Sequence, residues 1–202
     1  MRISFLLNVT GNGYFNNETR TRLRQGSVSL DLFWCTESHL AKELGLFFAS
    51  NVQVDYISHS ELQGTRAPDE STWALNLAQE VTDEIASRIH ETHARNQAGM
   101  EASPVMVARE NGKLVGLAIV SFFPQATVPY AIVEDLVVAQ EDRGREIGSA
   151  MLKWIMAEAR RAGCVRAFLE SGTRNAVAHQ LFEREGFSVC SVVLMKTLGA
   201  PQ

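Results

Sequence analysis

The segment best suited to chemistry runs from Val133 to Leu152, where a strand-like run passes through a basic turn into a helix-like run. The turn contains Arg143, Gly144, Arg145 and Gly148. The first backbone N–H groups of a helix lack internal partners, and the helix dipole adds partial positive charge at that end. Glycine lets an anion approach the backbone closely. The segment therefore predicts a site for a phosphate or pyrophosphate, to which the two arginines add cationic donors.

The same turn lacks the sequence features of two other phosphate sites. It has neither the Gly-Lys-Ser/Thr of a nucleotide P-loop nor the complete G-x-G-x-x-G of a dinucleotide site, and it follows several predicted strands rather than opening a βαβ unit. A basic turn before a helix is also an ordinary solvated surface feature. The turn alone leaves a binding site and a plain surface turn both open.

The elements that must position this turn alternate between strand and helix periods. Two β-rich runs within 105–120 flank Asn111-Gly112, the pair preferred in type I′ hairpin turns. Apolar residues recur every four positions from Leu77 to Ile89 and again from Ile147 to Ala159, which indicates amphipathic helices. The remaining expected elements are strands at 28–34, 130–138, 165–169 and 187–195, and helices through 40–48 and 175–186. The fold class predicted is α/β, with a mixed, mostly antiparallel sheet and flanking helices.

Two motifs together resemble the GCN5-related N-acetyltransferase (GNAT) family. The family hallmark Q/R-x-x-G-x-G/A is similar to Arg143-Gly-Arg-Glu-Ile-Gly148. Downstream, Asn175-Ala-Val-Ala-His-Gln-Leu-Phe-Glu-Arg-Glu-Gly-Phe187 resembles the second family signature, a helix that begins with Asn and ends in Gly-Phe. The resemblance covers roughly residues 104 to 195, and the expected element order extends it back to about Val28. It implies a GNAT acetyltransferase domain over 28–198, preceded by an N-terminal extension at 1–27 that is either peripheral or a short hairpin.

The resemblance implies acetyl-CoA, or another acyl-CoA, as co-substrate and no metal. The strand from Val133 would splay from its neighbour, and its backbone at Leu136, Val137 and Val138 would pair with the pantetheine arm. Asn175 would lie near that arm, and Phe182 beside the thioester sulfur. The backbone N–H groups that would hold the pyrophosphate belong to Arg143, Gly144, Arg145, Glu146, Ile147, Gly148 and Ser149.

Two residues depart from the family pattern. Glu146 stands where the hallmark has its middle glycine, and a carboxylate there repels a pyrophosphate unless it points outward; we expect it to face solvent. Phe182 stands where many relatives carry a tyrosine that protonates the departing thiolate. Phenylalanine has no proton to give, so water or another group supplies it, or the thiolate leaves unassisted.

Glu134 is the first candidate for the general base that amine attack needs. It lies in a strand that otherwise reads as buried, beside the expected thioester, and burial of a carboxylate requires a reason. Asp135 would point to the opposite face of a regular strand, although a bulge would change that. The alternative is that both carboxylates are exposed or paired with arginines. His179 faces either the site or solvent.

The acceptor is only weakly indicated. Relatives shape the acceptor pocket in the irregular stretch after the first helix, which here holds Asp55, Tyr56, His59 and Glu61. The acidity of this stretch hints at a cationic acceptor. The resemblance therefore implies an N-acetyltransferase acting on a small-molecule amine or a protein amino group. The alternative function is a catalytically impaired module that binds or senses acyl-CoA, and its only support is Glu146 and Phe182.

Composition excludes several classes of protein and site. The 202 residues carry a net charge of −4, which does not favour a nucleic-acid partner. Cys35, Cys164 and Cys190 are odd in number and widely spaced, which argues against a zinc site or a disulfide framework and for free thiols in a reducing cytosol. No apolar run reaches membrane-spanning length, so a cytoplasmic location without membrane contact is expected. The family resemblance adds a homodimer as an expectation.

Overall fold

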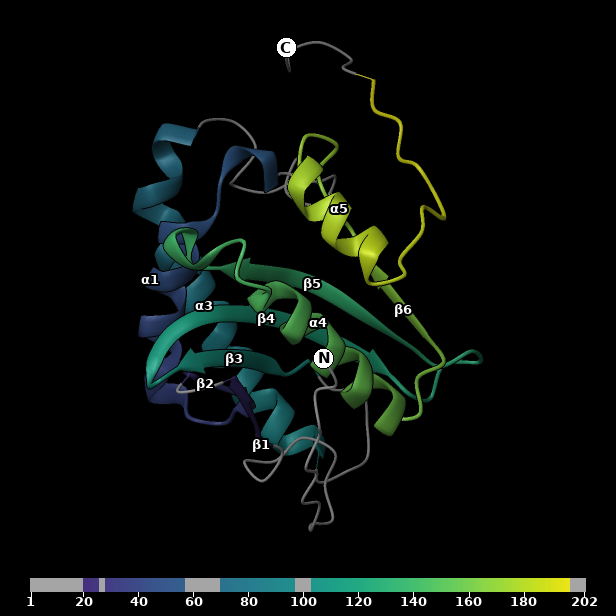
Figure 1. Cartoon of the computed structure of the whole chain (residues 1–202), viewed down its shortest axis with the longest axis horizontal. Helices are drawn as coiled ribbons and strands as arrows, with labels where there is room; N and C mark the ends of the chain where they lie inside the picture. The colour runs from purple at the N-terminus through teal and green to yellow at the C-terminus, as the bar shows by residue number, and fades with distance from the viewer. Residues whose placement is uncertain (1–19, 26–27, 57–69, 97–102, 197–202) are drawn as a thin grey trace, which may run out of the picture.

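The residues that the structure describes form one six-stranded sheet, seen in Figure 1, in which the strands follow their order in the sequence, β1 to β6. The computed structural model describes residues 20–25, 28–56, 70–96 and 103–196. The strands are β1 Arg20–Gln25, β2 Val28–Cys35, β3 Val105–Glu110, β4 Lys113–Phe123, β5 Tyr130–Val138 and β6 Arg166–Leu169. Neighbouring strands are antiparallel from β1 to β5, whereas β5 and β6 are parallel. This mixed, mostly antiparallel sheet confirms the predicted fold class.

Helices cover both faces of the sheet. Within the described ranges the α-helices are α1 Ala41–Asn51, α3 Glu70–Asn96, α4 Ile147–Arg161 and α5 Ala176–Arg184, and the short 3-10 turns are η1 Ser38–Leu40, η2 Val54–Tyr56 and η3 Gln140–Asp142. One core packs α1 and α3 on one face, and the other packs α4, with part of α5, on the opposite face. Because α4 links the parallel strands β5 and β6, it serves as their crossover connection. No helix in these described ranges is long and apolar enough to cross a membrane.

The Asn-Gly hairpin forms as predicted. Asn111 and Gly112 both have positive φ, 49° and 88°, as a type I′ turn requires, and they join Glu110 of β3 to Lys113 of β4. This turn lies at the same end of the sheet as the loop after β5, because Lys113 contacts Asp142. The hairpin therefore helps to position the predicted anion-binding turn.

Part of the expected N-terminal extension belongs to the sheet. Residues 20–25 form β1, which pairs with β2 along its whole length, so the hairpin alternative describes this part. Asp31 of β2 accepts hydrogen bonds from Arg20 and Arg22 of β1, at 2.8 and 2.6 Å. The hydrogen bond from Arg22 is the main reason that the pKa of Asp31 is lowered. Residues 1–19 lie outside the described residues.

The prediction of a final strand at 187–195 is wrong. Residues 187–196 form no helix or strand, and every residue from Ser188 to Lys196 is exposed. The segment has strand-like residues, but a strand exists only where a neighbouring strand completes its backbone hydrogen bonds. Figure 1 shows this segment in yellow, leaving the end of α5 and running away from the sheet.

Candidate functional site

A splayed pair of strands opens the sheet at its C-terminal edge. β5 pairs with β6 only from Tyr130 to Val133, opposite Arg166 to Leu169. The following residues of β5, Asp135 to Val138, keep their pairing with β4 but have no strand on the other side among the described residues. One edge of this backbone is therefore available to an extended ligand, as expected for the segment around Leu136, Val137 and Val138.

The turn before α4 presents backbone N–H groups. Gly144 and Glu146 both adopt the left-handed conformation, with φ of 76° and 63°, and α4 begins at Ile147. The first hydrogen bond into the helix runs from the N–H of Ala150 to the carbonyl of Glu146, at 2.9 Å. The N–H groups of the preceding helical turn thus point out of the helix, where an anion binds most readily.

Gly148 allows a close approach between α4, β5 and α5. A Cβ atom added there would lie 3.2 Å from Leu181 Cδ2 of α5 and 3.7 Å from Val138 Cγ2 of β5. The first turn of α4 is therefore packed beside the open edge of β5, with α5 next to both. A side chain at this position would narrow the space that a ligand needs at the helix N-terminus.

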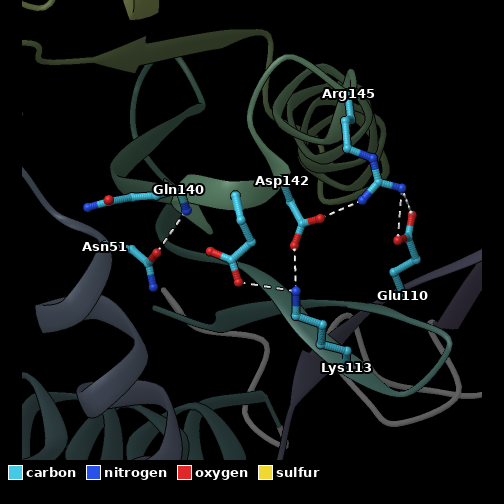
Figure 2. Close-up of polar contacts among 7 residues, drawn as sticks. Asn51, Glu110, Lys113, Gln140, Asp142 and Arg145 are labelled. Carbon is cyan, nitrogen blue, oxygen red and sulfur yellow. Dashed lines mark hydrogen bonds and ion pairs between the residues drawn. The ribbon is translucent and has the colours of Figure 1, made fainter.

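A polar network fixes the loop between β5 and α4, as Figure 2 shows. Asp142, with a side chain only 8% exposed, accepts hydrogen bonds from Lys113 of the hairpin at 3.0 Å and from Arg145 at 2.5 Å. These bonds hold the pKa of Asp142 below its usual value, with the Lys113 hydrogen bond as the larger favourable cause and burial opposing it. On the other side of the loop, Asn51 Oδ1 accepts a hydrogen bond from the backbone N–H of Gln140 at 2.9 Å.

The two predicted arginine donors have different surroundings. Arg145 bonds Asp142 and also places Nη2 2.9 Å from both carboxylate oxygens of Glu110, so its charge is balanced by carboxylates. Arg143 instead donates to three neutral oxygens, those of Val138, Gln53 and Asn51, at 3.3, 2.8 and 2.6 Å. No carboxylate among the described residues forms an ion pair with Arg143. Its positive charge therefore contributes to the potential of the turn, whereas Arg145 serves mainly to hold the loop.

A β-bulge places Glu134 and Asp135 on the same side of the sheet. The pairing of β4 with β5 shifts between Ile119↔Asp135 and Val120↔Val133, so Glu134 is the extra residue. Val133 packs in the core under α4, but Glu134 contacts Arg88 of α3 and Asp135 contacts Tyr56 after α1. Of the two geometries weighed from the sequence, the bulge is the one present. Both carboxylates face the layer of α1 and α3.

Glu134 is held by two polar partners. Its side chain, 31% exposed, accepts hydrogen bonds from Arg88 Nη2 and Ser121 Oγ, both at 2.5 Å. Arg88 also binds Glu84 at 2.8 Å. Burial lowers the pKa of Arg88, but the charges of Glu134 and Glu84 outweigh that effect and raise it overall. Sequence reasoning missed Arg88 as an individual residue, although it lies next to the apolar stripe of α3, where a charged residue needs a partner.

Asp135 is the more buried carboxylate, at 7% exposure. Tyr56 donates a hydrogen bond to it, which brings the irregular stretch after α1 into contact with β5. Tyr56 thus contacts β5, whereas Asp55 is exposed, and the expectation that this stretch shapes the acceptor pocket stays a prediction. His59 and Glu61 lie outside the described residues.

The helix α5 borders the same region from the α4 side. Asn175 is its N-cap, as predicted, and its side chain accepts a hydrogen bond from the N–H of Ala178 at 3.4 Å. Phe182 is half-buried against the core, with its ring 6.2 Å from that of Phe187. Ser149 of α4 donates to Glu185 at the end of α5, at 2.5 Å, which ties the two helices together. His179 is half-buried on the same helix.

The sequence profile of the acetyltransferase (GNAT) family matches residues 70–187. The chain belongs to the GNAT family. The matched range includes β3 to β6, α4 and α5, and thus the splayed strands and the turn before α4.

Several relatives of this GNAT chain share either sequence or fold. It is 34% identical over 85 residues to an aminoalkylphosphonate N-acetyltransferase of Salmonella typhimurium, covering 40% of this chain and 54% of that protein. It is 32% identical over 83 residues to an IAA acetyltransferase of Azospirillum brasilense, covering 41% and 53%. The chain therefore spans about half the length of the curated relatives it matches. The PaiA N-acetyltransferase of Thermoplasma acidophilum, solved in complex with coenzyme A, shares the fold with a TM-score of 0.61 at 14% identity, covering 82% of this chain and 93% of that chain.

The backbone of this GNAT chain gives a physical reason for the middle glycine of the family hallmark. At that position the chain turns into α4 through a left-handed residue, a conformation that glycine adopts without penalty. Here the residue is Glu146, whose side chain is 65% exposed and forms an ion pair with Arg184 of α5 at 3.0 Å. The carboxylate thus points to solvent, as expected, and one arginine partly neutralises it.

Proposed function

We propose that the protein transfers an acetyl group from acetyl-CoA to a primary amine. The observation that carries the proposal is the continuity of three features: the open edge of β5 from Glu134 to Val138, the left-handed turn at Gly144 and Glu146, and the unpaired N-terminus of α4. The extended pantetheine arm of acetyl-CoA would fit the open strand edge, and its pyrophosphate would fit the anion site that follows. Family membership supports the same proposal.

The residues divide between the two ends of the cofactor. The N–H groups from Gly144 to Ser149 would bind the pyrophosphate, with added attraction from the positive charge of Arg143, whose own N–H donates to the carbonyl of Gln140 at 3.4 Å instead. The backbone of Leu136 to Val138 would hydrogen-bond the pantetheine arm, with Asn175 nearby. Phe182 is half-buried next to this region and would pack beside the thioester end. Gly148 would leave room for the cofactor at the N-terminus of α4, because a Cβ atom at this position would fill the space up to Leu181 of α5.

Glu134 is the proposed general base. The amine nitrogen attacks the thioester carbonyl carbon, the C–S bond breaks, and the proton lost by the amine passes to the Glu134 carboxylate. Arg88 and Ser121 hold that carboxylate in place. The Glu134 side chain is 31% exposed, so an amine can reach it. Phe182 supplies no proton, so the sulfur leaves as a thiolate, which is reasonable because thiols have pKa values of about 8.5.

The acceptor proposed is a cationic amine. Glu134 and Asp135 lie on the same face because of the bulge, so two carboxylates border the side from which the acceptor would approach. Arg88 neutralises one of them, and Tyr56 donates to the other. The remaining negative charge favours an ammonium group over an anionic acceptor.

Release of free CoA from acetyl-CoA, in the presence of a panel of primary amines, tests the activity. The reaction should be followed by chromatography of CoA rather than by a thiol reagent, because the protein has free cysteine thiols of its own that can consume the reagent. Amine-dependent CoA release supports the proposal. Binding of acetyl-CoA without release for any amine would support the binding-module alternative instead.

The base assignment makes a separate prediction for Glu134→Gln. With an active amine, we expect kcat/KM to fall by roughly 10²–10⁴, because the proton of the attacking amine loses its acceptor. Glu84→Gln is the matched control, because it removes the other carboxylate from Arg88 and leaves Glu134 in place. An unchanged kcat/KM in Glu134→Gln would exclude Glu134 as the base and leave Asp135 as the next carboxylate to examine.

A further inference from the structure

The sheet carries a cluster of aromatic rings along the same strands as Glu134. The rings of Phe123 of β4 and Tyr130 of β5 are stacked, with centroids 4.6 Å apart and an interplanar angle of 20°. The ring of Phe168 of β6 meets Tyr130 edge-on, at 5.8 Å and 77°. Three neighbouring strands therefore contribute one ring each to a continuous patch, which we call the aromatic surface.

The aromatic surface lies on the same face of the sheet as the carboxylate of Glu134. Ser121 of β4 pairs with Ile132 of β5, and two residues further along β4 Phe123 pairs with Tyr130. Directly paired residues point to the same face, and so do residues two apart in one strand. Ser121 donates a hydrogen bond to Glu134 at 2.5 Å, so the carboxylate is also on this face.

The aromatic surface belongs to neither hydrophobic core. Among the residues that the structure describes, the core under α4 reaches Val133 and the core under α1 and α3 reaches Ile119, but neither includes the three rings. Phe168 is 38% exposed, and Phe123 and Tyr130 are half-buried. Apolar side chains gathered outside a core are typical of a binding surface.

The spacing along β5 suits a ligand that reaches from the rings to Glu134. Residues two apart on one face of a strand are separated by about 7 Å, so Ile132 lies one such step from Glu134 and Tyr130 lies two. An amine with its nitrogen at Glu134 therefore has its body above Ile132. A ring attached through a two-carbon linker would extend from there onto the aromatic surface.

The charges at the two ends of this path favour a ligand with a single ammonium group. The bulge places the carboxylates of Glu134 and Asp135 at one end. Arg166 of β6 is exposed and pairs with Tyr130, which places a positive charge at the other end. The carboxylates attract one ammonium group, whereas a second ammonium at the far end of a diamine would meet Arg166.

We propose that the acceptor is a primary monoamine with an aromatic body, whose ring packs on the aromatic surface while its nitrogen faces Glu134. The inference rests on the proposed acetyl transfer and adds the class of amine that this site selects. A ligand ring packs on such a surface through offset stacking or edge-to-face contacts. The aromatic surface would thus determine which amine binds, whereas Glu134 would accept its proton, so selectivity and turnover can be measured separately.

Binding is measured first, by isothermal titration calorimetry of the native protein saturated with free CoA, which has no acetyl group to transfer. Phenethylamine, ethylamine and putrescine are the three probes. We expect phenethylamine to bind roughly tenfold more tightly than ethylamine, because its ring leaves water for an apolar surface. Putrescine should bind no better than ethylamine. Equal affinities for phenethylamine and ethylamine, or tightest binding of putrescine, would overturn the proposal.

Tyr130→Leu and Phe168→Ala test whether the rings carry the preference. Each should reduce the preference for phenethylamine roughly two- to tenfold, the usual strength of one aromatic pair, and leave ethylamine affinity unchanged, which also shows that the variant is folded. Val165→Ala is the matched control, because Val165 is 70% exposed next to β6 but alternates to the opposite face from Phe168, so the preference should remain. A preference that persists in both Tyr130→Leu and Phe168→Ala would place the ring elsewhere and overturn the proposal.

Release of CoA from acetyl-CoA with the same three amines separates this inference from the proposed function. We expect kcat/KM to follow the order of affinities, with phenethylamine first. Selective binding of phenethylamine without CoA release for any amine would contradict the acetyl transfer and still support the ligand class. CoA release with a higher kcat/KM for ethylamine or putrescine would support the transfer and overturn the aromatic acceptor.

Discussion

Glu146 has two unfavourable properties, a strained backbone conformation and a negative charge beside the proposed pyrophosphate site. Its φ of 63° is left-handed, a conformation that costs a residue with a Cβ about 1–2 kcal/mol. Its ion pair with Arg184 joins side chains that are 65% and 55% exposed, so it contributes little, about 0–1 kcal/mol. The strain lowers the stability of the fold, and the negative charge opposes a tightly bound pyrophosphate at this turn.

Glu146→Gly should therefore stabilise the protein. We expect the free energy of unfolding to rise by about 0.5–1 kcal/mol, because the relief of strain exceeds the lost ion pair and the added freedom of glycine in the unfolded chain. Urea denaturation measures this, with Glu146→Ala as the control that removes the carboxylate but keeps the strain. A loss of stability in Glu146→Gly, or an equal gain in Glu146→Ala, would contradict the explanation.

Asp142 offers a prediction about pH. Its folded-state pKa is lowered, so its contribution to stability is complete above the unfolded-state pKa of about 3.9 and is lost as the pH falls through the lower folded-state value. Asp142→Asn should lower the free energy of unfolding at pH 7 by about 1.5 kcal/mol, the lower end for hydrogen bonds to charged groups, because Lys113 is 57% exposed. The difference from the native protein should shrink below about pH 4.

Glu141→Gln is the matched control for Asp142→Asn. Glu141 accepts from the same Lys113 at 3.1 Å, but its side chain is 63% exposed, so its loss should change the unfolding free energy little. Equal effects of the two substitutions in urea denaturation would mean that Asp142 holds the loop no more firmly than a surface carboxylate.

Individual residues also show where sequence reasoning reaches its limit. The Asn111-Gly112 turn, the N-cap at Asn175 and the outward Glu146 follow from local rules, which act over a few residues. The different surroundings of Arg143 and Arg145 depend on Glu110 and Asn51, which are distant in sequence and meet the loop only through the sheet and α1. Arg88 beside Glu134 is likewise a contact over 46 positions. No spacing pattern predicts such pairs.

Among the elements, α1 and α3 pack closely at Gly45. A Cβ atom added to Gly45 would lie 2.7 Å from the carbonyl oxygen of Ala78 and would also meet Thr82. Glycine therefore lets the backbones of α1 and α3 approach closely. This layer supports Tyr56 and Arg88, the partners of Asp135 and Glu134.

Gly45→Ala should accordingly destabilise the fold by about 1–3 kcal/mol, the usual cost of overpacking. Thermal or urea unfolding measures the change. Ala49→Gly, a loss of side chain later on α1, distinguishes close packing from helix propensity, because it should cost only about 1 kcal/mol. A Gly45→Ala variant at least as stable as the native protein would show that the two helices can separate without loss.

Some features of the strands follow from the local sequence pattern, and others do not. The Asn111-Gly112 turn was predicted because two residues with positive φ define it. The bulge at Glu134 was only one of two alternatives, because the pattern of apolar residues in one strand does not show where its pairing with the next strand is interrupted. The strand predicted at 187–195 was wrong because strand composition is a property of one segment, whereas pairing needs a second.

At the scale of the whole molecule, the order of elements was sufficient to predict a mixed, mostly antiparallel sheet with flanking helices. The residues that fix strand order and splay are not adjacent in sequence, so the parallel pairing of β5 with β6 over only Tyr130 to Val133 came from the structure. That partial pairing, followed by the α4 turn, is what makes an acyl-CoA site the central claim.

Thermal unfolding with and without acetyl-CoA tests that claim most directly. A ligand that binds only the folded state at 100 times its Kd should stabilise the protein by about 2.7 kcal/mol. We expect a clear rise in Tm with acetyl-CoA and with CoA, and a much smaller rise in Arg143→Gln at the same concentrations, measured against the Tm of that variant without ligand. No rise at millimolar acetyl-CoA, or the same rise in both proteins, would contradict the assignment of this turn to the cofactor pyrophosphate.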